Sequence, residues 1–184
     1  MNHLLQITTP RLELIPCSLE VAQSVVAQNK LEVENLLGVR VPDDWYAGEV
    51  LDFFPAYAQM LAEDPSQLGW GVWLMIHNED YTLIGDLGFG GKPDQQGSVE
   101  IGYEVLPKYR DQGYAFEAVQ ALVNFAFTQP ELKRIIAHCP ENIPASIRIL
   151  EKLGMQHLEI FDTNDYPTAP MLKWQMTLES NSSY

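Results

Sequence analysis

The sequence predicts a mixed α+β domain, and three observations support that class. The chain has 184 residues with a hydrophobic content of 46%, which is typical of one globular domain. Apolar residues recur at helical spacing before Pro65 and alternate with polar residues after it. Beyond Gly113, segments with apolar residues at helical spacing are followed by segments in which apolar and polar residues alternate. Because no internal repeat or low-complexity linker interrupts them, we expect residues 1–184 to form one domain, with a polar tail over 179–184.

The N-terminal third reads as one strand followed by helices. The patterns place the strand over residues 9–16 and the helices over 18–28, 31–37 and 48–62. Ser18 is a good N-cap for the first helix, and Gly38 is suited to end the second. Pro55 lies inside the third pattern, so we expect it to kink or split that helix.

The rest of the chain begins with three strands. We expect antiparallel strands over residues 70–77, 82–89 and 98–105, because short runs of turn-forming residues separate them. The strongest helical pattern of the chain follows over 113–128. After it come a strand over 132–139, a helix over 142–153, and strands over 155–161 and 171–178.

Composition excludes several classes of protein. The chain carries 11 basic and 25 acidic residues, a net charge of −14, which argues against nucleic acid and anionic membranes as partners. We expect no secretory signal and no membrane span, and the two cysteines indicate a reducing cytoplasm. Cys17 and Cys139 are far apart and are expected to be free thiols, with Cys139 a buried small residue. The four His are scattered, so no metal site is expected.

The junction between the strand ending at Val105 and the helix opening at Gly113 is suited to hold an anion. The free N–H groups of a first helical turn and the helix dipole attract negative charge, and Gly113 and Ala115 let a ligand approach closely. Pro107 has no N–H, so strand pairing should loosen and free the backbone of Val105 and Leu106. A loop whose glycine serves only a tight turn would fit the same pattern.

The charge around this junction differs from that of the whole chain. Residues 105–155 hold six basic and five acidic residues, a net charge of +1, whereas the remainder carries −15. We therefore expect a phosphate-bearing ligand to be tolerated in this stretch.

A second candidate segment begins at Asn142. Asn142 is a good N-cap, and Ser146 lies one helical turn later on the same side. A capped surface helix that ends at Gly154 would explain Asn142 and Gly154 but leaves Ser146 without a role.

These segments, in this order and spacing, resemble the GNAT superfamily of acetyl-CoA-dependent N-acetyltransferases. The run over 110–115 matches the family's Arg/Gln-x-x-Gly-x-Gly/Ala pyrophosphate loop, and residues 142–155 match its second cofactor motif. The Thr-Pro-Arg-Leu-Glu-Leu run over 9–14 and Glu-Ile-Gly-Tyr over 100–103 are similar to the branch with ribosomal-protein N-terminal acetyltransferases. The resemblance covers about residues 8–178. It implies a mostly antiparallel twisted sheet flanked by helices, with splayed central strands.

The resemblance also implies acetyl-CoA as the acyl donor and cosubstrate. The backbone of Val105 and Leu106 would bind the pantetheine, and Asn142 would contact the pantetheine or a water. The pyrophosphate would be held by Arg110, Asp111, Gln112, Gly113, Tyr114 and Ala115.

Two residues are candidates for catalysis of direct transfer to a primary amine. An amine is mostly protonated near pH 7, so Glu100, close to where a histone-modifying branch has its catalytic Glu, is our candidate base, directly or through water. We expect burial on its strand to favour this role; a purely structural acceptor is the alternative. Many family members use a Tyr where this chain has Leu150, so Ser146 is our candidate to stabilise the leaving thiolate. The thiolate could also leave unaided, and a catalytic carboxylate used by some relatives would fall at Ala137 or His138.

The acceptor is expected to be an amine-bearing small molecule or a protein N-terminus. Residues 1–64 hold ten acidic and three basic residues, and Asp43 and Asp44 precede two aromatics, a combination that suits a cation; an ordinary solvated loop is the alternative. The sequence is also compatible with a homodimer. A non-catalytic acyl-CoA sensor or interaction module on the same fold is the alternative function.

Overall fold

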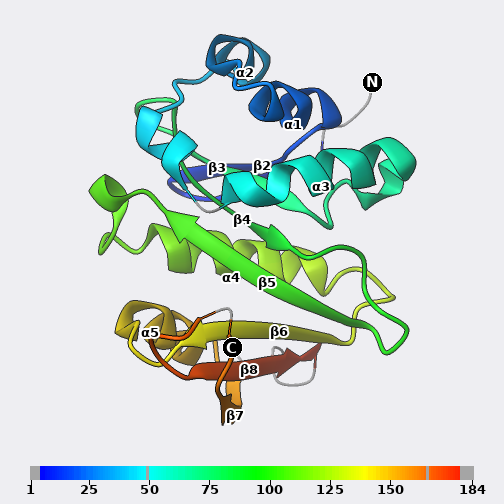
Figure 1. The fold of residues 1–184 in the computed structure, drawn as a ribbon, viewed down its shortest axis with the longest axis vertical. Helices are drawn as coiled ribbons and strands as arrows, with labels where there is room; N and C mark the ends of the chain where they lie inside the picture. The colour runs from blue at the N-terminus through cyan, green and yellow to red at the C-terminus, as the bar shows by residue number, and fades with distance from the viewer. Residues whose placement is uncertain (1–4, 49, 165, 179–184) are drawn as a thin grey trace.

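The computed structural model describes residues 5–48, 50–164 and 166–178. Within these residues, eight strands form one sheet in the order β1-β2-β3-β4-β5-β6-β8-β7. Neighbouring strands are antiparallel except β5 and β6, which are parallel. The strands are β1 Ile7–Thr8, β2 Leu12–Pro16, β3 Val72–His77, β4 Thr82–Phe89, β5 Ser98–Val105, β6 Arg134–Pro140, β7 Gln156–Phe161 and β8 Met171–Thr177. The predicted mixed α+β class is confirmed (Figure 1).

The helices are α1 Leu19–Val26, α2 Lys30–Leu37, α3 Val50–Glu63, α4 Tyr114–Ala126 and α5 Pro144–Lys152. The predicted caps of the first two helices are confirmed: the Ser18 hydroxyl accepts from the Val21 N–H, and Gly38 closes α2 in the left-handed region. The predicted split at Pro55 is wrong, because α3 runs unbroken across it. Phe54 and Tyr57, both fully buried, anchor this part of the helix and offset the missing hydrogen bond.

The start of α5 also differs from the prediction. Asn142 is not its N-cap: the helix begins at Pro144, and Ile143 occupies the cap position without a side-chain hydrogen bond. Proline is favoured at the first helical position, and its ring disfavours helical backbone at the preceding residue. Asn142 therefore lies outside the helix and is exposed.

The core lies mainly where α4 packs against the sheet. The buried face of α4 presents small and branched side chains, among them Ala118, Val119 and Leu122, none of which is exposed. Alternate residues of β6 and β8 are buried, which is the pattern of strands with one covered face. Figure 1 shows α4 behind β5, while α3 crosses in front of the strands at the N-terminal end of the sheet.

The two central strands diverge. β5 pairs with β6 over three residues, Ser98 to Glu100. β5 then continues along β4 as far as Val105, while β6 continues along β8 as far as Pro140. Figure 1 shows the strands separating toward α5. The predicted splay is confirmed, and it opens the sheet at its centre.

The predicted tail over 179–184 lies outside the described residues. No helix within the described residues is long and apolar enough to cross a membrane.

Candidate active site

A cavity of about 410 Å³ lies between the divergent ends of β5 and β6 and the start of α5. We call it the donor cavity. Ser146 and Leu150 of α5 line it. The structure therefore places the candidate catalytic residue Ser146 at the splay. The other lining residues are Ile101, Gly102, Tyr103, Ala137, His138, Cys139, Pro140, Ile143, Tyr166 and Met171.

A second cavity of about 380 Å³ lies over β4 and β5 and includes Phe53 of α3. We call it the acceptor cavity. Three carboxylates line it, those of Asp86, Glu100 and Glu104. Its floor is glycine-rich, and a Cβ built at Gly102 would meet no atom within 4 Å, so the space above this residue is open. The two cavities share four lining residues, namely Ile101, Gly102, Tyr103 and His138.

Glu100 lies in the acceptor cavity but is not buried. Its side chain is 58% exposed, so the expected burial is wrong. Glu100 Oε1 lies 2.7 Å from His138 Nδ1 on β6, and the two groups form a hydrogen bond across the splay. Sequence reasoning named His138 only as a position where some relatives carry a carboxylate. No local sequence pattern gives this contact, because it depends on the parallel register of β5 and β6, in which Glu100 pairs with Ile136 and His138 lies two residues beyond on the same face.

Tyr103 joins the walls of the donor cavity. Its hydroxyl donates to the Ser146 carbonyl oxygen over 3.4 Å, linking β5 to α5. Burial raises the pKa of Tyr103 to about 12, so the phenol keeps its proton at neutral pH. Burial also raises the pKa of the Cys139 thiol, which makes this residue a poor nucleophile.

The predicted phosphate loop has the backbone of an anion cradle. Gly113 is the N-cap of α4 in the left-handed region, with φ of 83°, and it makes no side-chain cap, so N–H groups of the first turn have no capping side chain. Asp111 has φ of 58°. These conformations turn the chain sharply just before the helix, as the glycine in this motif predicted.

The backbone at Val105 and Leu106 is not free, contrary to expectation. The Leu106 N–H donates to the Ile84 carbonyl over 2.8 Å, so β4 pairing extends past Val105. The Val105 carbonyl accepts from Arg110 Nε at 2.8 Å, and Arg110 Nη2 lies 3.4 Å from Glu104 Oε1. Pro107 loosens pairing only beyond this point, where a short 3₁₀ helix begins.

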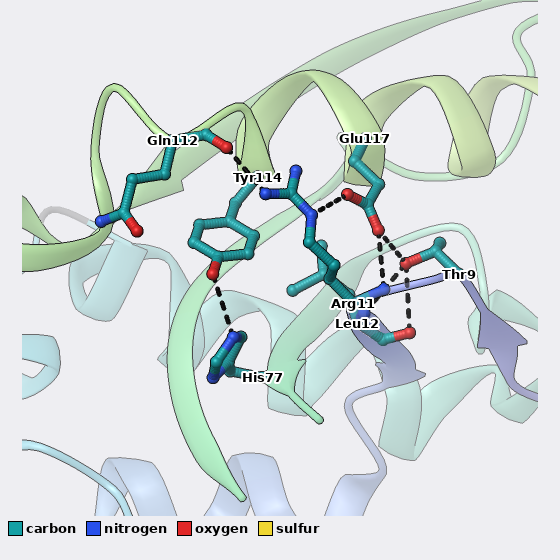
Figure 2. Close-up of polar contacts among 7 residues, drawn as sticks. All are labelled: Thr9, Arg11, Leu12, His77, Gln112, Tyr114 and Glu117. Carbon is teal, nitrogen blue, oxygen red and sulfur yellow. Dashed lines mark hydrogen bonds and ion pairs between the residues drawn. The ribbon is translucent and has the colours of Figure 1, made fainter. Parts of the chain in front are cut away.

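A segment near the N-terminus contacts the predicted phosphate loop and the first turns of α4, as Figure 2 shows. Arg11 Nη1 donates to the Gln112 carbonyl over 2.8 Å, and Arg11 Nε pairs with Glu117 Oε2 at 2.7 Å. The guanidinium also lies 4.3 Å from the centre of the Tyr114 ring. Burial alone would raise the pKa of Glu117, but hydrogen bonds from Thr9 and Arg11 hold it below its ordinary value.

On the other side of Tyr114, its hydroxyl shares a hydrogen bond of 3.0 Å with His77 Nε2. His77 Nδ1 in turn lies 2.9 Å from Asp80 Oδ1. Tyr114 thus connects α4 to β3 and the turn after it, which fixes the start of the helix from inside.

Asp86 is a buried carboxyl group of the candidate site that sequence reasoning missed. It is 6% exposed, and its Oδ2 accepts from Trp45 Nε1 at 2.9 Å. Burial raises its pKa to about 7, against the hydrogen bond from Trp45 and with the help of the nearby Glu104 charge. Asp44, Trp45, Asp86 and Glu104 also line a neighbouring cavity of about 400 Å³, so part of the predicted acidic–aromatic segment faces this region. Asp43 instead pairs with Lys30 at the surface.

No group of three or more His, Cys, Asp or Glu side chains within the described residues is arranged to hold a metal ion.

Comparison with known proteins agrees with this architecture. Residues 11–156 match the acetyltransferase (GNAT) domain family. The N-acetyltransferase YjdG of Bacillus subtilis, itself uncharacterised, is 29% identical over 146 residues, which cover 79% of this chain and 86% of that protein. The ribosomal-protein-serine acetyltransferase of Escherichia coli is 31% identical over 88 residues, 48% of this chain and 49% of that protein.

Solved structures share the fold at low identity. RimL, a ribosomal L7/L12 α-N-protein acetyltransferase solved with coenzyme A, has a TM-score of 0.69 at 16% identity, over 96% of this chain and 99% of that one. A GNAT-family acetyltransferase from Bacillus anthracis has a TM-score of 0.65 at 22% identity, over 95% and 99% of the two chains. The splayed sheet and the anion cradle before α4 agree with the family match over residues 11–156. The chain therefore belongs to the GNAT family and is an acetyl-CoA-dependent acyltransferase.

Proposed function

We propose that this enzyme transfers the acetyl group of acetyl-CoA directly to a primary amine. The observation that carries the proposal is the meeting of the donor and acceptor cavities at the splay, through Ile101, Gly102, Tyr103 and His138. A thioester in one cavity and an amine in the other would be within reach of each other without a covalent enzyme intermediate. We further propose that residues 1–184 act as one domain. A cytoplasmic location fits the free Cys17 and Cys139.

The donor side of the proposal rests on the loop before α4. The pyrophosphate would be bound by backbone N–H groups and side chains of Arg110, Asp111, Gln112, Gly113, Tyr114 and Ala115. Arg110 would leave the Val105 carbonyl for the phosphate, which frees this carbonyl at the end of β5 for the pantetheine. The Leu106 N–H would bind the pantetheine by leaving the Ile84 carbonyl. Asn142 is exposed beside the donor cavity and would contact the pantetheine or a water.

The proposed chemistry is a single displacement. The amine nitrogen attacks the thioester carbonyl, a C–N bond forms and the C–S bond breaks. Glu100 takes part in removing the amine proton, directly or through water. Ser146 donates a hydrogen bond to the departing thiolate. Acetyl-CoA supplies the acyl group.

For the acceptor we propose a protein N-terminus. Support comes from relatives named as ribosomal-protein acetyltransferases and from the carboxylates of the acceptor cavity, which suit a cationic amine. A small amine is the second candidate. A relative named FsC-acetyl coenzyme A-N(2)-transacetylase, from Aspergillus fumigatus, is 35% identical over 71 residues.

The test is a thiol-release screen with acetyl-CoA against peptides that begin with Ser, Ala or Met and against spermidine and ethanolamine. We expect turnover with at least one of them, with calorimetric binding of CoA. Binding without any turnover would favour an acyl-CoA sensor, and absence of CoA binding would contradict both functions. Ser146→Ala should lower kcat about 10- to 100-fold with little change in CoA affinity, since a hydrogen bond to a charged group contributes about 1.5–3 kcal/mol.

A further inference from the structure

We propose that His138 is the catalytic base of this enzyme and that Glu100 is the positioning residue that orients it. The inference rests on the proposed amine acetylation. It extends that function by moving the proton-accepting atom from the strand β5 carboxylate to the imidazole on β6.

The first support is location. His138 is one of the four residues shared by the donor and acceptor cavities, so its ring borders both the expected thioester and the expected amine. Glu100 lines only the acceptor cavity. Of the shared residues, His138 and Tyr103 have polar side chains, and Tyr103 is a phenol that stays protonated at neutral pH.

The second support is the hydrogen bond. Glu100 Oε1 lies 2.7 Å from His138 Nδ1, and this contact leaves Nε2 as the atom that can take a proton. A carboxylate on one imidazole nitrogen fixes the tautomer and stabilises the imidazolium that forms, as in other catalytic dyads. The Phe161 ring, with its centre 5.7 Å away and nearly perpendicular, packs against the imidazole and limits its rotation.

The third support is the difference in exposure of the two groups. The Glu100 side chain is 58% exposed, whereas that of His138 is 25% exposed. A carboxylate in open water is a weak base for an ammonium proton, while an imidazole is matched to neutral pH.

The other titratable groups near His138 lie on β8 and around the two cavities. Lys173 of β8 is its partner in register, but Lys173 Nζ pairs with Glu159 Oε1 of β7 at 2.9 Å. The remaining groups around the two cavities are Asp86, Glu104, Tyr103, Cys139 and Tyr166.

The amine reacts in its neutral form, after its ammonium has released one proton to solvent. A second proton passes from the nitrogen to His138 Nε2 as the nitrogen attacks the thioester carbonyl, a C–N bond forms, and the C–S bond breaks to release CoA thiolate. The proton then leaves the imidazolium to solvent or to the thiolate, which restores the neutral ring. Glu100 keeps its charge throughout.

The experiment compares His138→Gln, His138→Ala, Glu100→Gln and the double variant His138→Gln/Glu100→Gln, with the peptide or amine of the panel that the unaltered enzyme acetylates fastest. His157→Gln is the matched control, because His157 packs on Trp174 and lines neither cavity. We expect kcat to fall at least 100-fold in His138→Gln, with CoA affinity and Tm unchanged, and to stay unchanged in His157→Gln. Free imidazole should restore activity to His138→Ala at least tenfold but should not restore Glu100→Gln.

Glu100→Gln should lower kcat less than His138→Gln, and the double variant should be no worse than His138→Gln alone, since the two residues act as a unit. The assignment is overturned if His138→Gln keeps kcat within threefold, or if imidazole fails to restore His138→Ala while CoA binding is intact. Failure of the unaltered enzyme to acetylate any amine would instead overturn the proposed function, and this assignment with it.

Discussion

Asp86 shows how much of the site depends on single residues. Its carboxyl group is buried between two cavities and has Trp45 as its hydrogen-bond donor. Burying a carboxylate is costly, and this burial is the main cause of the raised pKa of about 7. At neutral pH the group is therefore a source of instability inside the acceptor region.

Asp86→Asn should stabilise the protein more at pH 8 than at pH 5. Because the folded-state pKa of about 7 exceeds the ordinary 3.8, the contribution of Asp86 to stability is present at low pH and is lost as the pH rises through about 7. Asparagine keeps an acceptor for Trp45 and has no charge to bury. The gain at pH 8 should be roughly 2–4 kcal/mol in the free energy of unfolding, measured in urea.

The control for this prediction is Asp52→Asn, at an exposed carboxylate in the first turn of α3. Its effect on the free energy of unfolding should be small and the same at both pH values. An Asp86→Asn effect that does not change between pH 5 and pH 8 would contradict the raised pKa.

Gly102 illustrates a residue whose absence of a side chain serves the site. Gly102→Ala should leave Tm almost unchanged, because its Cβ would meet no atom within 4 Å. The methyl group would stand where the two cavities join, so kcat/KM should fall about tenfold, since small misplacements of reacting groups are costly. Unchanged kinetics in steady-state assays would show that the reaction does not pass over this residue.

At the scale of elements, the start of α4 is held by contacts from distant segments. Arg11 donates a hydrogen bond to the Gln112 carbonyl and forms an ion pair with Glu117, while Tyr114 is hydrogen-bonded to His77 (Figure 2). Such contacts order a loop before the ligand arrives, which lowers the conformational cost of binding.

Arg11→Ala should raise the KM for acetyl-CoA several-fold and leave kcat within about twofold. The variant loses the hydrogen bond to the Gln112 carbonyl and leaves Glu117 without its cation, so the phosphate loop becomes less ordered. Initial-rate kinetics at saturating amine would measure both constants. Lys30→Ala, which removes an exposed ion pair with Asp43, should change neither constant.

Prediction from sequence succeeded best at this scale where local chemistry decided the outcome. Residues 98–105 form a strand with the predicted bounds, because their alternation and flanking turns agree. The start of α5 was misplaced by two residues, because Pro144 competed with Asn142 for the helix start and the proline prevailed. Pairing at Leu106 was missed because β4 extends beside it, a contact that no local pattern encodes.

At the scale of the whole molecule, the charge is unevenly placed. The net charge is −14, yet residues 105–155, which contain the phosphate loop, carry +1. Carboxylates instead line the acceptor cavity. The field of the protein therefore favours a cationic acceptor without opposing a polyanionic donor at its own site.

Added salt should reduce the enzyme's efficiency with the acceptor more than its affinity for acetyl-CoA. For a peptide acceptor with a free amino terminus, kcat/KM should fall as NaCl rises from about 0.05 to 0.5 M, because screening shortens the reach of the acidic field. The KM for acetyl-CoA should change less over the same range. Potassium glutamate at the same ionic strength should act as NaCl does, and a kcat/KM for the acceptor that does not change with salt would contradict electrostatic attraction.

The sequence by itself determined the order of the elements, the mixed α+β class, the loop at 110–115 and the acidic balance, because these follow from local periodicity, turn chemistry and motif spacing. The splay of the central strands was expected only from the resemblance to the GNAT superfamily. The tertiary structure decided which side chains meet at the candidate active site. It alone brings His138 of β6 to Glu100 of β5, buries Asp86 against Trp45, and closes the backbone of Leu106 onto β4. Each of these contacts joins residues from separate elements, and its energy depends on where the sheet puts them rather than on their neighbours in the chain.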